Sequence, residues 1–164
     1  KGNAGAWLAS AMSGGVVHVT GSAGDFLGAA GPGDRFGLTG GAVVVGGTTG
    51  ARTGEKMRRG TIIIKGRSGP LTASRMIGGT IIAEGGFGEA PGMLMRRGTL
   101  IGPSVARLLP TFVDCGMHDL LVLRILSKYL KDTLGALAPK PFPLKARKFG
   151  GDMATIGKGE LLIV

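Results

Sequence analysis

Short runs of β-branched and other apolar residues, each preceded by a glycine, recur along the first hundred residues of the chain. They occupy residues 16–19, 42–45, 61–64, 80–83 and 99–101. Such runs are typical of strands, and the spacing between them leaves too little room for a helix in each copy. Because side chains alternate across a strand, one face should carry a continuous apolar ladder. The inward ladder is predicted to contain Val17, Val43, Ile62, Ile81 and Leu100.

The opposite face of the same strands is also apolar. After His18 in the first run, this outward stripe contains Val44, Ile63, Ile82 and Ile101. Strands that are apolar on both faces are normally covered on both faces. We therefore expect the stripe to meet another protein surface or the chain's own C-terminal helix, and we assign these four residues to a partner-facing interface. Scattered surface residues without a partner are the simpler alternative.

A framework of glycine and methionine surrounds the strands. One copy reads Gly47-x-x-Gly50 followed by Met57 and Gly60, and copies begin at residues 2, 21, 47, 66 and 85. The usual step is 19 residues, and the step from 21 to 47 is seven longer, which places an insertion at about residues 32–38. So regular a repeat predicts a mainly β fold, a right-handed single-stranded β-helix whose coils of 19 residues stack by backbone pairing.

The repeat stops at Gly102-Pro103, and a different pattern follows. Between Met117 and Leu134, leucines fall at steps of three, four and four residues, with charged residues between them. This spacing predicts an amphipathic helix, capped at its start by Asp114 or Asp119 and ended by Gly135. Three prolines then indicate an extended connector, and residues 157–164 should form a turn and a short strand.

These patterns divide the chain into three parts. Residues 1–103 form the predicted β-helix, 104–149 the helical cap and Pro-rich connector, and 150–164 the C-terminal turn and strand. The chain begins inside a repeat, and an uncapped coil is an open sheet edge. We therefore expect N-terminal coils that precede this sequence, or a partner chain at that end.

Positive charge is concentrated beside the methionine positions. The chain carries 20 Lys and Arg against 10 Asp and Glu, a net charge of +10. Arg58 and Arg59 follow one methionine position and Arg96 and Arg97 another, so stacking should align them into a basic column that faces a partner. Aromatic residues are 5% of the chain, and no nucleic-acid motif is present. We expect an acidic protein or small molecule rather than nucleic acid, and no apolar run is long enough for a membrane span.

The sequence contains no catalytic pattern that we can support. Cys115 is the only cysteine, which excludes an intrachain disulfide and fits a reducing cytoplasm. It lies near Asp114, His118 and Asp119, a cluster better explained by a helix start than by a nucleophile and base. Gly157-Lys158 lacks the spacing and the Ser or Thr of a phosphate loop. We predict no catalytic, cofactor-binding or metal-ligating residue.

The repeat resembles the β-helical domain shared by the C subunit of formylmethanofuran dehydrogenases and the C-terminal region of the glutamate synthase large subunit. Residues 109–116, LPTFVDCG, and 151–162, GDMATIGKGELL, look like the tail of that C subunit. Residues 24–28, GDFLG, and 57–60, MRRG, look most like the bacterial version in the formyltransferase/hydrolase complex of methylotrophs. The archaeal C subunit and the glutamate synthase spacer remain the alternatives, with an independent binding module as a third.

This resemblance implies a non-catalytic structural subunit in a complex of one-carbon metabolism. In the bacterial complex a formyl group passes from tetrahydromethanopterin to a methanofuran-type carrier and leaves as formate. In the archaeal complex CO2 is reduced and fixed onto methanofuran. Both activities belong to other subunits, so this chain should bind no cofactor itself and should have the catalytic subunits as partners. The glutamate-containing tail of the carrier is a further candidate ligand for the basic column.

Overall fold

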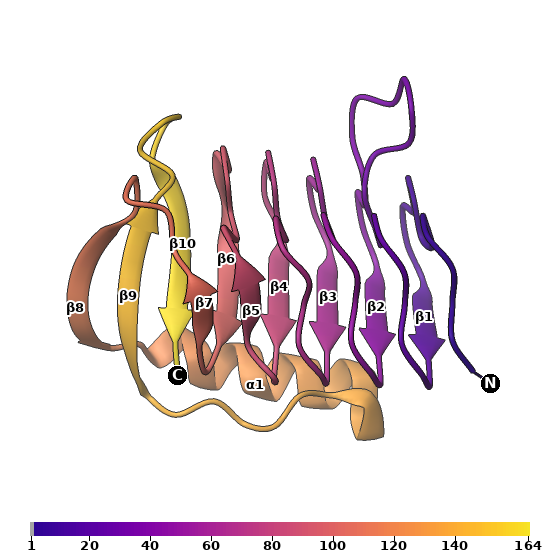
Figure 1. Cartoon of the computed structure of the whole chain (residues 1–164). Coiled ribbons are helices and arrows are strands. Elements are labelled where there is room, and N and C mark those ends of the chain that lie inside the picture. Colours follow the sequence, from indigo (N-terminus) through magenta and orange to yellow (C-terminus); the bar gives the residue numbers. More distant parts are fainter. Residues whose placement is uncertain (1) are drawn as a thin grey trace.

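A stack of parallel strands forms most of the computed structural model, which describes residues 2–164. The strands β1 (Val16–Val19), β2 (Ala42–Val45), β3 (Thr61–Ile64), β4 (Thr80–Ala83) and β6 (Arg97–Gly102) follow one another across one sheet (Figure 1). Their register pairs Val43 with Ile62, Ile62 with Ile81 and Ile81 with Leu100. The predicted ladder of inward side chains and the β-helical stack are therefore confirmed.

Each coil turns back through a compact corner that joins the methionine to the next strand. Gly79, just before β4, has a φ of +107°, and a Cβ built on it would lie 2.7 Å from the Met57 methyl group of the preceding coil. Only glycine combines this backbone conformation with such a close neighbour. The methionines therefore pack against the corner glycines of the following coils, inside the stack.

The insertion forms a projecting loop between β1 and β2, which rises above the corners of the other coils (Figure 1). A second, two-stranded sheet joins β5 (Phe87–Glu89) and β7 (Val105–Arg107) on another side of the last coils. The backbone thus continues to coil for a short distance beyond Gly102, where the glycine and methionine repeat has stopped.

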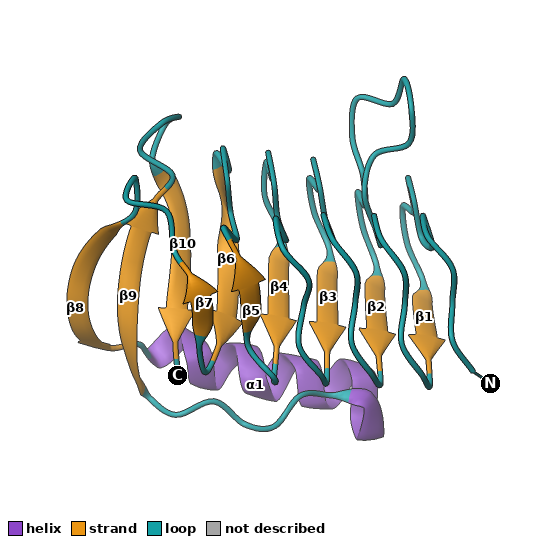
Figure 2. Ribbon diagram, in the orientation of Figure 1, coloured by secondary structure: helices purple, strands orange, loops and turns teal. Residues whose placement is uncertain are grey.

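The C-terminal part adds three strands and one helix. Figure 2 shows α1 (Leu121–Leu134) lying across the parallel stack, followed by the short 3₁₀ helix Gly135–Leu137. The strands β10 (Lys158–Ile163), β9 (Lys145–Gly151) and β8 (Val113–Asp119) extend the sheet in that order beyond β6. β10 is parallel to β6, whereas β9 and β8 are antiparallel to their neighbours.

The predicted start of the helix is wrong. Residues 113–119 form β8, which pairs with β9, and the helix begins only at Leu121 without a side-chain cap. Asp114 instead accepts hydrogen bonds from the backbone of Gly116 and from Arg147 on β9. Pairing with a distant strand has overridden the local capping pattern. Gly135 ends the helix as predicted, with a φ of +57°.

β10 occupies the place of a further coil. Gly159 pairs with Gly98 and Leu161 with Leu100, so the inward ladder continues across a gap in sequence. A Cβ built on Gly159 would lie 2.6 Å from the Met95 methyl group, a contact like that between Gly79 and Met57. The terminal strand was predicted, but its position as the next rung of the stack was not.

Side chains close the end of the last full coil. In earlier coils the N–H groups of Lys56 and Arg75 donate to backbone carbonyls of the following coil. The equivalent N–H, that of Leu94, donates instead to the Asp152 carboxylate at 2.8 Å. Burial raises the pKa of Asp152, but the polar contacts of its carboxylate, among them hydrogen bonds from the backbone N–H groups of Leu94 and Ala154, outweigh burial and leave this pKa lowered. A buried carboxylate thus replaces the missing backbone of a next coil.

Candidate functional site: a row of exposed arginines

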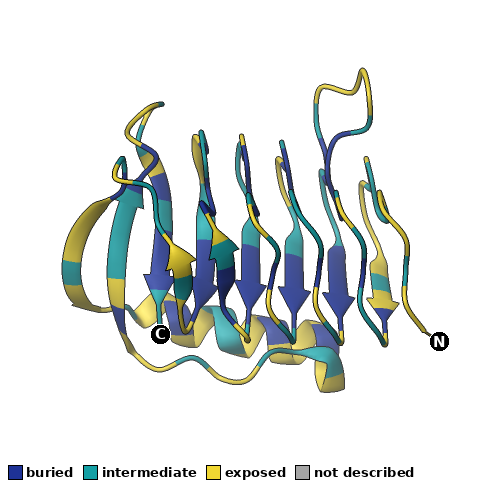
Figure 3. Ribbon diagram, viewed as in Figure 1, coloured by how far each residue is buried: buried dark blue, intermediate teal, exposed yellow. Residues whose placement is uncertain are grey.

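The outward apolar stripe is covered by the chain's own helix. Val44, Ile63, Ile82 and Ile101 are at most 1% exposed, and they share one buried cluster with residues of α1. The helix contributes Leu123, Leu130 and Leu134 to this cluster. Figure 3 shows the buried centres of the strands above the helix. Of the two coverings considered for the stripe, the C-terminal helix is the one present, and the four side chains have no free surface for a partner.

The ion pair of Lys65 with Glu84 fixes the position of the segment that follows the helix. Lys65 donates to Glu84, one coil further on, at 3.0 Å and to the backbone oxygen of Ala138 at 2.6 Å. Glu84 in turn accepts the N–H of Lys140 at 3.0 Å. Sequence reasoning missed this clamp, although its signal was a pair of opposite charges separated by one repeat.

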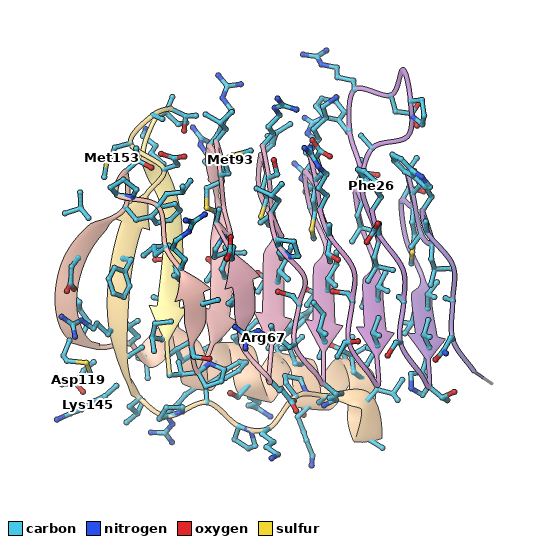
Figure 4. The ribbon with its side chains drawn as sticks, viewed as in Figure 1. Phe26, Arg67, Met93, Asp119, Lys145 and Met153 are labelled. Carbon is cyan, nitrogen blue, oxygen red and sulfur yellow. The ribbon has the colours of Figure 1, made fainter. Side chains whose placement is uncertain are left out.

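The four arginines of the predicted basic column lie at the corners of their coils. Arg58, Arg59, Arg96 and Arg97 are all exposed, and none forms an ion pair with a described residue. Figure 4 shows nitrogen-tipped side chains along the edge of the stack from which the insertion loop rises. This arrangement leaves the charges available to an acidic group from outside the chain.

The insertion loop orients one of these arginines. The Arg58 guanidinium carbon lies 4.7 Å from the centre of the Phe36 ring, and that of Arg35 lies 5.0 Å from the same ring. Cation–π contacts of this kind hold a guanidinium in place without neutralising it. The insertion therefore adds an aromatic support and a second guanidinium, that of Arg35, to one end of the row.

Arg75, in the coil between those of Arg58 and Arg96, differs from these two arginines. Its guanidinium lies 3.3 Å from the Glu55 carboxylate, which also pairs with Arg52 at 3.2 Å. The Glu55 side chain is 10% exposed and that of Arg75 is 52% exposed, so this bridge between two coils is shielded from solvent only on its carboxylate side. Arg75 is therefore engaged in an ion pair with Glu55, whereas Arg96 and Arg97 border an open hollow of about 270 Å³ with Ile77 and Ile156.

Residues 2–164 offer no cluster of metal-ligating side chains, that is, no group of three or more His, Cys, Asp or Glu side chains that could hold a metal ion. A His118 ring nitrogen lies 2.9 Å from the backbone oxygen of Cys115. The hydrogen bond from Arg147 lowers the pKa of Asp114 and occupies this carboxylate. No described helix is long and apolar enough to span a membrane.

Comparison with known proteins identifies a relative of the whole described stack. One chain of the crystal structure of the formyltransferase/hydrolase complex (FhcABCD) from Methylorubrum extorquens, in complex with methylofuran, is 41% identical and superimposes with a TM-score of 0.88 over 99% of this chain. The C subunit of the Fhc complex of that organism is 46% identical over 56 residues. The resemblance to the bacterial C subunit is confirmed.

The alignment covers nearly all of the present chain but only part of the relative. The present chain covers 60% of the solved chain, and the 56 matched residues are 34% of the present chain and 21% of the curated Fhc relative. No family model matches the sequence. The likeness therefore includes every coil and the C-terminal cap, while the relatives extend further than this chain does.

Proposed function

We propose that this chain is a non-catalytic structural subunit that organises the catalytic subunits of a formyl-transfer complex in one-carbon metabolism. The observation that carries the proposal is that Arg58, Arg59, Arg96 and Arg97 are exposed and form no ion pair with a described residue. A stacked coil of fixed spacing holds such charges at defined intervals and so suits a scaffold. The relation to one chain of the FhcABCD complex supports the same assignment.

The proposed complex transfers a formyl group from tetrahydromethanopterin to a methanofuran-type carrier, from which it is released as formate. All of these steps take place on partner subunits. The archaeal dehydrogenase, which reduces CO2, and the glutamate synthase spacer remain alternatives of different chemistry. The tail formed by residues 109–116 and 151–162 favours a C subunit of a formyl-transfer complex over the spacer.

Purification of the full-length protein from its source, with mass spectrometry and metal analysis, tests this function. We expect formyltransferase and amidohydrolase-like subunits to co-purify without tungsten or molybdenum. An iron–sulfur partner that carries either metal would assign the chain to CO2 reduction instead. Recovery of the protein alone and monomeric would overturn the subunit assignment.

The same arginines also suit a second ligand, the acidic tail of the carrier. Arg96 and Arg97 beside an open hollow favour this possibility, because a carboxylate-rich chain would follow a row of exposed positive charges. Changing Arg96 and Arg97 to Gln in the assembled complex separates the two roles. A loss of carrier affinity with assembly intact supports tail binding, whereas a loss of assembly supports ion pairs to a partner protein. Arg107→Gln, in an exposed pair elsewhere, is the matched control.

A further inference from the structure

The helix α1 carries a second apolar face that the sheet does not cover. Leu121, Val122, Ile125 and Tyr129, named here the outer stripe, are between 56% and 64% exposed. Residues three and four apart are neighbours on a helix surface, so these four side chains form a single row over two turns. The buried residues Leu123, Leu130 and Leu134 point to the sheet from another side of the helix.

The outer stripe leads into a hollow that contains one of the unpaired arginines. Tyr129 borders a hollow of about 250 Å³ together with Val16 of β1 and Arg59. Val16 is 54% exposed and adds apolar surface on the opposite side. An apolar row that ends beside an unneutralised guanidinium offers a partner both hydrophobic contacts and one ion pair. Exposed contiguous apolar surface of this kind marks interaction sites.

Charge decides which kind of partner fits. The other exposed flank of α1 carries Arg124, Lys128 and Lys131, and of these only Lys128 forms an ion pair within the described chain, with Asp132 at 3.0 Å. Two copies of a chain with a net charge of +10 would bring these basic flanks together. Like charges facing each other across an interface oppose association. A second copy is therefore disfavoured, and an acidic rim around an apolar centre is the complementary surface.

We infer that the outer stripe and the Arg59 hollow form the docking surface for one catalytic subunit, which presents apolar side chains and a carboxylate that reaches Arg59. This inference rests on the proposed function and adds the surface through which it operates. The spacing of Val122, Ile125 and Tyr129 at i, i+3 and i+7 is that of helix anchors in a groove, and tyrosine is enriched among residues that dominate binding. The helix thus joins the coil stack on one side to the partner on the other.

A pair of double variants tests the docking surface in the full-length protein co-produced with its catalytic subunits. Ile125→Asn with Tyr129→Asn removes the centre of the outer stripe, whereas Arg124→Asn with Lys128→Asn makes the same kind of change on the other flank. Both pairs are exposed, so circular dichroism should show the wild-type fold for each. We expect the stripe variant to weaken the affinity for the catalytic partner at least about tenfold, and the basic variant to change mainly its salt dependence.

The outcomes separate the docking surface from the proposed function. Failure of the wild-type chain to bind any catalytic subunit would overturn both. Normal binding of wild type and of the folded stripe variant would overturn only the docking surface. Self-association of the isolated chain that is abolished by the stripe variant would also overturn it, because the occupant would then be a second copy.

Discussion

The repeating coils and the C-terminal part are held together by different kinds of contact. In the coils, backbone groups of successive repeats form hydrogen bonds with each other at a constant interval; for example, the N–H of Arg75 donates to the carbonyl of Met93 in the next coil. In the C-terminal part β10 still pairs with β6 by its backbone, but single side chains replace the missing backbone elsewhere, as Asp152 does for Leu94 and as Lys65 does for the connector after α1. The repeat therefore tolerates little change at its contact glycines, whereas the C-terminal part depends on a few individual side chains.

Glycine contacts between coils should show the largest effect. A Cβ on Gly69 would lie 2.4 Å from the backbone oxygen and 2.5 Å from the backbone carbon of Gly50, and neither atom can move without separating two coils. We expect Gly69→Ala to lower the free energy of unfolding by at least about 3 kcal/mol or to prevent folding. Gly5 is the equivalent glycine of the first coil, where a Cβ would meet nothing within 4 Å. Gly5→Ala should unfold like wild type in urea, and an equal loss in both variants would contradict the stacking explanation.

The two faces of α1 should differ next. Leu130 is 1% exposed against the sheet, so Leu130→Ala is expected to lower the free energy of unfolding by about 2–5 kcal/mol through lost burial and a residual cavity. Ile125 lies on the same helix and is 61% exposed. Ile125→Ala should change stability by less than about 0.5 kcal/mol. Urea unfolding followed by circular dichroism measures both, and comparable losses would mean that the outer stripe supports the fold rather than binding.

The sequence predicts the coils well because every coil repeats the same local solution. Side chains alternate along Thr61–Ile64, which groups Ile62 with Ile64 on one face, and the shared 19-residue step aligns Ile62 with Ile81. For β8 this logic fails. Residues 113–119 are mostly exposed, their alternation of Val113, Cys115 and Met117 is short, and their partner β9 lies about 30 residues away, so pairing with β9 decides that they form a strand.

The candidate site was predictable to a similar extent. The arginines could be placed on one edge because they share a position in the repeat, and no such repetition exists in the helix. Its leucines at 123, 126, 130 and 134 indicated one apolar face, and this strong pattern obscured the second row at 121, 122, 125 and 129. Placing β10 as the next rung was possible in principle, because Gly159 repeats the role of Gly98.

A smaller, pH-dependent effect is expected at Asp152. Asp152→Asn should lower the free energy of unfolding at neutral pH by about 1–2 kcal/mol, because an amide cannot accept both backbone N–H groups equally well. The pKa of Asp152 is lowered in the folded chain, so its contribution is present above the unfolded value of about 3.9 and is lost as the pH falls through the folded pKa. Urea midpoints measured from neutral to acidic pH should therefore converge for variant and wild type. Asp119→Asn, at an exposed position, is the control.

The smallest effect should come from the ion pair at the outer edge of the C-terminal sheet. The Nε of Arg147 lies 3.1 Å from the Asp114 carboxylate, and the side chains of Arg147 and Asp114 are 56% and 40% exposed. The hydrogen bond from Arg147 lowers the pKa of Asp114, so the pair acts above the ordinary pKa of the carboxyl and weakens as the pH falls through the lowered value. Exposed pairs contribute little and are screened by salt. Thermal unfolding of Asp114→Asn should thus differ slightly from wild type at low salt and not at high salt. A loss as large as that of Leu130→Ala would instead show that β8 belongs to the same cooperative unit as the coils, and that side chains at this edge matter as much as backbone pairing does in the repeat.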